Sequence, residues 1–194
     1  MRSWGFAKSA ITALMEVGIA NYSSNDYPGM IEGFPFEWWL DDNFIINSDN
    51  FKINNEDPNA QELLLFAQFP AEAILHIENS NTSLNRAEEL VANGVLTGIG
   101  NGKADAFRHA FWNAQGTAEF GSVVMKIFAD AHEWGENGLS VTMDFYNNHK
   151  GRVIGDNYNF LTSETIISAA ILKAVYNGTL KYINNSGVLV PTNL

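Results

Sequence analysis

Acidic, basic and imidazole side chains recur at helical spacing in the string DAFRHAFWNA, which begins at Asp105. At 100° per residue, one stripe of this helix carries Asp105, Arg108, His109, Trp112 and Asn113. These residue types can bind a metal, transfer a proton or hold an anion. An amphipathic surface helix has the same spacing, but its outer stripe is usually Lys, Glu and Gln, so the composition favours a site.

A second stripe follows in the string MDFYNNHKGRVIG. Offsets of three, four, seven and eight residues put one group on a single helix face: Asp144, Asn147, Asn148, Gly151 and Arg152. Gly155 continues this face, and two glycines there allow another backbone to approach closely. His149 points about 100° away from Asn148, so we leave it out of the site.

Between these helices, the string FADAHEWG places Asp130 and Glu133 on one helix face and His132 on the other. A regular helix cannot direct all three at one point. If Gly135 ends the helix and its last turn unwinds, His132 can turn toward Asp130; otherwise it serves a second contact.

Convergence of the three stripes leaves an excess of negative charge, because four carboxylates face two guanidinium groups. Burial of that excess is costly, so the group must be lined by solvent, partly protonated or bound to a cation. A divalent metal, zinc or manganese, suits Asp and His ligands. The alternatives are a metal-free network of ion pairs and hydrogen bonds, or plain solvated helix faces. The predicted metal ligands are His109, Asp130, His132 and Asp144.

Hydrolysis is the reaction that this set favours. Glu133 is the predicted acid or base, and Arg108 and Arg152 are predicted to stabilise a developing negative charge. The sequence has no nucleophile elbow and no evident Ser/His/Asp arrangement, so covalent acyl transfer is the weaker interpretation. The rival hypothesis is a non-enzymatic binding or effector module with a structural hydrogen-bond network. The rest of the predicted polar cluster is Asp105, Trp112, Asn113, Asn147 and Asn148.

Hydrophobic periodicity predicts an all-α fold, a compact multi-helix bundle with an irregular, aromatic-rich N-terminal segment. The chain is read as one domain over 1–194, with an N-terminal helix and loop extension over 1–57 and a helical core over 58–180. A helical pattern from residue 58 is interrupted by Pro70. Further helices are expected at 83–93, 104–120, 122–134, about 140–154 and 163–177.

The amino-acid composition limits the classes of molecule that the protein is expected to bind. A net charge of -11 over 194 residues opposes nucleic-acid binding, and small-molecule or peptide ligands fit better. The absence of Cys excludes disulfides, thiolate zinc sites and cysteine nucleophiles. No segment is apolar enough to span a membrane. Glu16 interrupts the first apolar stretch, so we expect no signal peptide, and both a cytoplasmic location and signal-independent export stay open. The oligomeric state is not indicated.

Three ordered strings, GNGKADAFRHAFWNA, FADAHE and MDFYNNHKGRVIG, run between residues 100 and 155. In these motifs the chain resembles an uncharacterised family of bacterial α-helical domains, found in secreted or surface-associated proteins and at the ends of toxin-like multidomain chains. The resemblance covers about 60–180, implies a helical domain and brings no established activity. The resemblance also implies that Tyr146 stands where relatives equally carry His, and the loss of a metal ligand there would weaken the metal interpretation.

Overall fold

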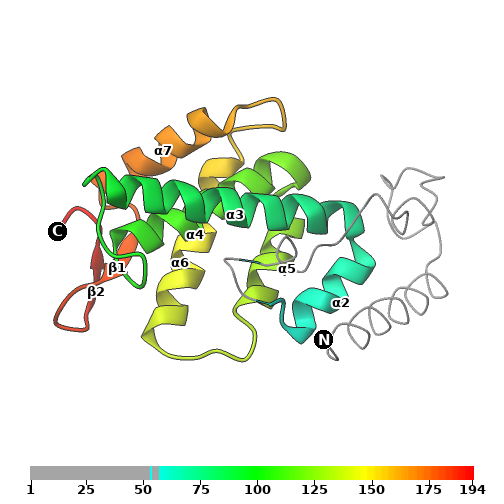
Figure 1. Cartoon of the computed structure of the whole chain (residues 1–194), viewed down its shortest axis with the longest axis horizontal. Coiled ribbons are helices and arrows are strands. Elements are labelled where there is room, and N and C mark those ends of the chain that lie inside the picture. The colour runs from blue at the N-terminus through cyan, green and yellow to red at the C-terminus, as the bar shows by residue number, and fades with distance from the viewer. Residues whose placement is uncertain (1–52, 54–56) are drawn as a thin grey trace.

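The computed structural model describes residue 53 and residues 57–194. Within that part the chain forms six helices and one small hairpin (Figure 1). The predicted all-α fold is confirmed. The expected N-terminal helix and aromatic-rich loop lie outside the described residues. The helices are α2 (Ala60–Gln68), α3 (Pro70–Ala92), α4 (Lys103–Phe120), α5 (Ser122–His132), α6 (Leu139–Gly155) and α7 (Glu164–Tyr176).

Helix α4 is the centre of the fold. It packs against α3, α5, α6 and α7, and nearly every residue between Ala104 and Ala118 is buried. Its alanine- and phenylalanine-rich side lies in one core cluster with α3 and α7, whereas Trp112 belongs to a second cluster with α2, α3 and α5. The polar stripe of α4 therefore faces other helices, and the surface-helix interpretation is wrong.

Pro70 ends one helix and begins the next, as its missing N–H and fixed φ predict. Helix α3 then continues through 83–93, so the separate helix expected there is wrong. Polar side chains in the middle of α3 are buried: Asn79 donates to Glu119 at 2.6 Å and Ser83 donates to Gln115 at 3.0 Å. These side chains bond to α4 and leave the α3 backbone intact. In Figure 1, α3 runs along most of the length of the described fold.

Two glycines let α6 cross α4 closely, which confirms the expectation from their spacing. A Cβ on Gly151 would lie 2.2 Å from the backbone oxygen of Ala110, and a Cβ on Gly155 would lie 2.6 Å from that of Ala114. Real Cβ atoms do not approach a backbone so closely. The crossing therefore brings the polar stripes of the two helices directly together.

The last residues form a hairpin that the periodicity did not predict. Strand β1 (Lys181–Ile183) pairs antiparallel with β2 (Leu189–Pro191), with Tyr182 opposite Val190. The Asn147 side chain on α6 donates to Lys181 O at 2.8 Å and accepts from Lys181 N at 3.0 Å. The hairpin is thereby tied to α6.

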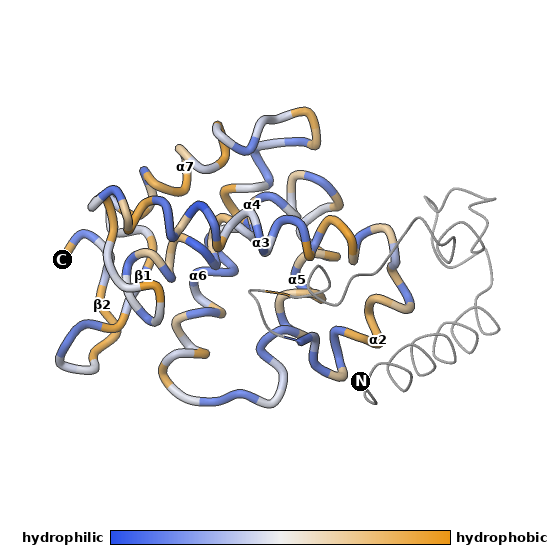
Figure 2. The backbone as a smooth tube through the Cα atoms, viewed as in Figure 1, coloured by the Kyte–Doolittle hydropathy of each residue, from blue (hydrophilic) through white to orange (hydrophobic). Residues whose placement is uncertain are grey.

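The connection between α5 and α6 is mostly hydrophilic (Figure 2), and it turns at Gly135 and Gly138, both of which have positive φ. This turn returns α6 beside α4. None of the described helices is both long and apolar enough to cross a membrane.

Candidate functional site

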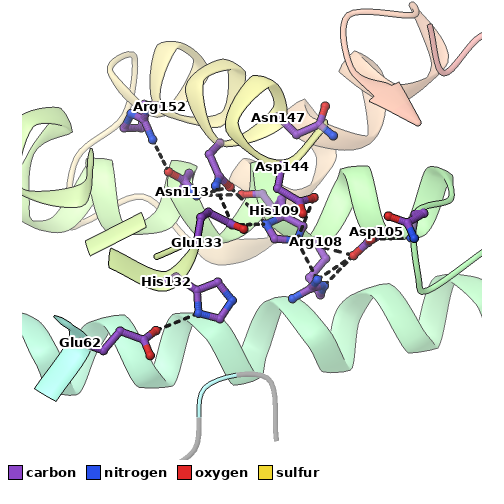
Figure 3. Close-up of polar contacts among 12 residues, drawn as sticks. Glu62, Asp105, Arg108, His109, Asn113, His132, Glu133, Asp144, Asn147 and Arg152 are labelled. Atoms are coloured by element: carbon purple, nitrogen blue, oxygen red, sulfur yellow. Dashed lines mark hydrogen bonds and ion pairs between the residues drawn. The ribbon is translucent and has the colours of Figure 1, made fainter. Parts of the chain in front are cut away.

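The central helix, the end of α5 and helix α6 bring seven polar side chains together (Figure 3). Six of them come from the two stripes of α4 and α6, and Glu133 is the residue that caps the C-terminus of α5. Each of the seven is less than a tenth exposed. They are Asp105, His109, Asn113, Glu133, Asp144, Asn148 and Arg152.

Three acceptor atoms converge at one end of this group. Asp105 Oδ1 lies 3.7 Å from His109 Nε2, and Asp144 Oδ1 lies 3.2 Å from the same nitrogen. One ligand atom from each of these buried residues lies within 4.8 Å of the other two. Asp105 and His109 are four residues apart on α4, so helical spacing aligns them, and the crossing of α6 adds Asp144.

Asp105 is held rigidly in this arrangement. Its Oδ2 accepts the backbone N–H of Asn101 at 2.6 Å, and its Oδ1 accepts Arg108 Nε at 3.0 Å and Nη2 at 2.7 Å. Asn101 has a φ of 62°, in the left-handed region, within the glycine-bearing loop that leads into α4. The backbone of this loop thus helps to orient the Asp105 carboxylate.

His109 is neutral in this environment. Burial lowers its pKa well below the usual range, and the charges of Arg108 and His132 lower it further. Arg108 Nη2 lies 2.7 Å from His109 Nε2. Because a guanidinium only donates, Nε2 must accept this hydrogen bond.

Asp144 lacks the hydrogen-bond donors that Asp105 has at its ligand oxygen. Its Oδ1 is buried and makes no hydrogen bond within the described residues. Burial raises the pKa of Asp144 to about 8, and the negative charges of Glu133 and Asp105 contribute in the same direction. A proton or a cation is therefore needed to neutralise this carboxylate at neutral pH.

The opposite edge of the His109 ring faces a different set of groups. Nδ1 lies 3.3 Å from Asn148 Oδ1 and 3.7 Å from Glu133 Oε1. Asn148 Nδ2 donates to Glu133 Oε1 at 3.3 Å. Burial raises the pKa of Glu133. Glu133 thus lies beside the ring edge that faces away from Asp105 and Asp144.

Arg152 closes the far end of the cluster. Its Nη1 donates to Asn113 Oδ1 at 2.7 Å, and Asn113 Nδ2 donates to Asn148 Oδ1 at 2.8 Å and to the backbone oxygen of His109 at 3.1 Å. Burial lowers the pKa of Arg152. This guanidinium bonds to an amide that helps to hold the cluster.

Four residues of the sequence-predicted set have other contacts. Asp130 forms an ion pair with Lys126 at the protein surface. His132 Nδ1 lies 2.8 Å from Glu62 Oε1, which is the second contact considered for it. Asn147 bonds to the hairpin, as described above. Trp112 donates from Nε1 to the backbone oxygen of His76 at 3.0 Å, and its ring contacts those of His76 and His132.

Sequence reasoning missed the groups that hold α5 from a distance. Glu62 is buried, bonds to His132 and completes a capping box with Asn59, whose Nδ2 donates to Ala131 O at 2.8 Å. The pattern N-x-x-E at a helix start was the available signal, but it indicates only the cap. Its partner lies 70 residues away in the chain.

The donor set that could hold a metal is Asp105, His109 and Asp144. Two carboxylate oxygens and one imidazole nitrogen suit a divalent ion of the zinc or manganese kind. Asp130 and His132, which the sequence analysis predicted as ligands, are not part of this group.

Comparison with known proteins gives one match. Residues 63–179 match a family described as a domain of unknown function (DUF6973). No curated protein and no solved structure matches the chain.

Proposed function

The chain belongs to the DUF6973 family, whose function is unknown, and we propose that it is a metal-assisted hydrolase with a divalent cation bound by Asp105, His109 and Asp144. The proposal rests on the chemistry of these side chains, because the family description brings no activity with it.

The buried Oδ1 of Asp144 is the observation that carries the proposal. It has no hydrogen bond within the described residues, although it lies 3.2 Å from His109 Nε2. Asp105 Oδ1 adds a third acceptor to this point. An unpaired buried acceptor such as Asp144 Oδ1 is costly, whereas a divalent cation would bind it together with the other two atoms and neutralise both carboxylates.

The same geometry supports a hydrolytic role. Three protein ligands leave coordination positions open for water, and a bound divalent ion lowers the pKa of that water so that hydroxide forms near neutral pH. Arg108 is the most exposed charged group beside the ligand atoms, at 14% of its side chain. With a cation bound at these atoms, the Arg108 guanidinium would be the group placed to stabilise negative charge that develops on a substrate.

The roles of two predicted catalytic residues change in this proposal. Glu133 lies nearest to Nδ1 of His109, so it orients the ring through Asn148 and does not act on water at the metal. Arg152 is buried and bonded to Asn113, so the anion-binding role belongs to Arg108.

Metal content tests the first half of the proposal. Protein purified without chelator is expected to contain about one equivalent of zinc or manganese by elemental analysis. His109→Ala should lose the metal. The matched control is His149→Ala, which removes an exposed imidazole one residue after Asn148 on the same helix. Full occupancy in His109→Ala would overturn the assignment.

Hydrolysis is tested with a panel of chromogenic phosphate esters, carboxylic esters and peptides. Turnover of one class should be lost with EDTA and restored by zinc or manganese. It should fall by at least a hundredfold in Asp144→Asn and stay within twofold of the parent protein in His149→Ala. Turnover that survives complete removal of metal would exclude this mechanism.

A non-enzymatic module is the second candidate, and one observation favours it. Arg108 already bonds both Asp105 and His109, so most of the network is closed without an ion. On this hypothesis, His109→Ala lowers the melting temperature by several degrees and neither the variant nor the parent protein binds metal. A stable His109→Ala variant that loses metal favours the enzyme.

A further inference from the structure

A continuous chain of hydrogen bonds joins the Arg152 guanidinium to the His109 ring across the α4–α6 crossing. Arg152 Nη1 donates to Asn113 Oδ1 at 2.7 Å, and Asn113 Nδ2 donates to Asn148 Oδ1 at 2.8 Å. The same Asn148 oxygen lies 3.3 Å from His109 Nδ1. All four side chains in this series of hydrogen bonds are buried.

The charge at one end decides the orientation of each amide. A guanidinium has donors only, so Asn113 must turn its oxygen toward Arg152. Asn113 Nδ2 then faces Asn148, so Asn148 must accept this hydrogen bond with its side-chain oxygen. A reversal of either amide would put two donors against each other in a buried site, at the cost of an unmade hydrogen bond.

The Asn148 oxygen then decides which nitrogen of His109 carries the proton. Because this oxygen only accepts, Nδ1 must be the donor, and Nε2 keeps its lone pair. The contact of Arg108 Nη2 with Nε2, at 2.7 Å, requires the same tautomer from the other side of the ring. On its other side Asn148 Nδ2 donates to Glu133 Oε1 at 3.3 Å, which agrees with an amide oxygen that faces the ring.

We propose that Arg152 is a positioning residue that acts through Asn113 and Asn148, together with the Arg108 contact at Nε2, to hold His109 in the Nδ1–H tautomer, and so presents the Nε2 lone pair to Asp105 and Asp144. The tautomer is independent of any metal. Its consequence for metal binding rests on the proposed function.

The two tautomers have opposite consequences at the ligand atoms. With the proton on Nδ1, Nε2 and the two carboxylate oxygens are all acceptors, and a cation can bind. With the proton on Nε2, the ring would donate to Asp144 Oδ1, 3.2 Å away, and the group would close without an ion. The orientation of the Asn113 amide, two hydrogen bonds away from the His109 ring, thus selects between a metal site and a hydrogen-bond network.

The first experiment reads the tautomer directly in the metal-free full chain. The ¹⁵N shifts of the His109 ring nitrogens, correlated with the ring protons and assigned by the loss of the signal in His109→Gln, distinguish the two forms. The wild-type ring is expected to be protonated on Nδ1. Arg152→Met should move a measurable fraction to Nε2–H, because it removes the donor and keeps a side chain of similar length. Arg152→Lys should restore the Nδ1–H form.

Matched variants separate this effect from general destabilisation. Arg86→Met removes a guanidinium on α3 that pairs with Glu89, and should leave the His109 shifts unchanged. Asn113→Asp keeps an acceptor for Arg152 but offers no N–H to Asn148, so it should shift the tautomer while the Arg152 guanidinium keeps its partner. It supplies the test if Arg152→Met does not fold.

The second experiment titrates zinc or manganese into the same proteins by calorimetry. We expect Arg152→Met and Asn113→Asp to weaken binding at least tenfold, and Arg152→Lys to stay within threefold of the parent protein. An Nε2–H ring in the wild type, or an unchanged tautomer in both Arg152→Met and Asn113→Asp, overturns the inference. A shifted tautomer in a protein that binds no metal supports the inference and contradicts the proposed function.

Discussion

Asp144 Oδ1 on α6 lies 3.2 Å from His109 Nε2 on α4, and each of these two atoms is an acceptor. The contact is repulsive for an ionised Asp144 beside a neutral imidazole unless a proton or a cation lies between them. The two helices hold the atoms there because Gly151 and Gly155 bring the backbones together. The helix crossing thus holds Asp144 Oδ1 beside His109 Nε2, although no described side chain donates a hydrogen bond to that oxygen.

The first prediction concerns Asp144→Asn in metal-free protein. The pKa of Asp144 rises from the ordinary 3.8 to about 8 on folding, so the folded state favours the protonated form. Its contribution to stability is therefore present below pH 3.8 and is lost as the pH rises through 8. Asp144→Asn removes this loss. Its gain in unfolding free energy should be about 4 kcal/mol larger at pH 9 than at pH 5, since three pH units lie between pH 5 and the folded-state pKa.

Urea unfolding in EDTA at both pH values measures this difference, and Asp130→Asn is the control. Asp130 pairs with Lys126 at the surface and its charge also acts on Arg152, so its replacement should change stability by the same amount at both pH values. If Asp144→Asn is no more favourable at pH 9 than at pH 5, Asp144 is not desolvated as the structure indicates.

Local sequence spacing predicted the arrangement of residues within each helix, and failed where distant segments meet. Asp105 and His109 share a face by helical arithmetic, and the glycines of α6 correctly indicated a close crossing. The contact of His132 with Glu62 joins residues 70 apart, and no periodicity encodes it. Which carboxylates share one point depends on the helix packing, and this is why Asp105 lies beside His109 and Asp144 while Asp130 lies at the surface.

The second prediction concerns His76, which is fully buried between the rings of Trp112 and Phe128. Neither of its ring nitrogens has a hydrogen bond within the described residues. Burial, and then the charge of His132, lower its pKa well below 6.5. The folded state therefore rejects a proton that the unfolded chain accepts, and stability is lost as the pH falls below 6.5.

His76→Phe keeps an aromatic ring and removes both unpaired nitrogens. We expect a gain in unfolding free energy of about 1 kcal/mol at pH 8. The gain should be larger at pH 5, because there the wild type is also destabilised by protonation of His76 in the unfolded state. Thermal unfolding at both pH values measures this, with the exposed His149→Phe as control. A loss of stability at pH 8 would mean that the ring nitrogens contribute bonds that the substitution breaks.

The third prediction joins the helix crossing to the site. In Gly151→Ala the new methyl group would lie 2.2 Å from the backbone oxygen of Ala110, and a backbone cannot move aside as a side chain does. Helices α4 and α6 must separate, at a cost of about 2 to 4 kcal/mol. Gly100→Ala is the control, because a Cβ there meets nothing within 4 Å and its φ needs no glycine.

Separation of the helices also moves Asp144 away from His109, since they lie on opposite sides of the crossing. Gly151→Ala should therefore weaken zinc or manganese binding at least tenfold at a temperature where circular dichroism shows it folded, whereas Gly100→Ala keeps parental affinity. A destabilised Gly151→Ala variant with unchanged affinity would place the metal ligands elsewhere. A variant with parental stability would show that α4 and α6 can accommodate a methyl group at Gly151, contrary to the 2.2 Å contact.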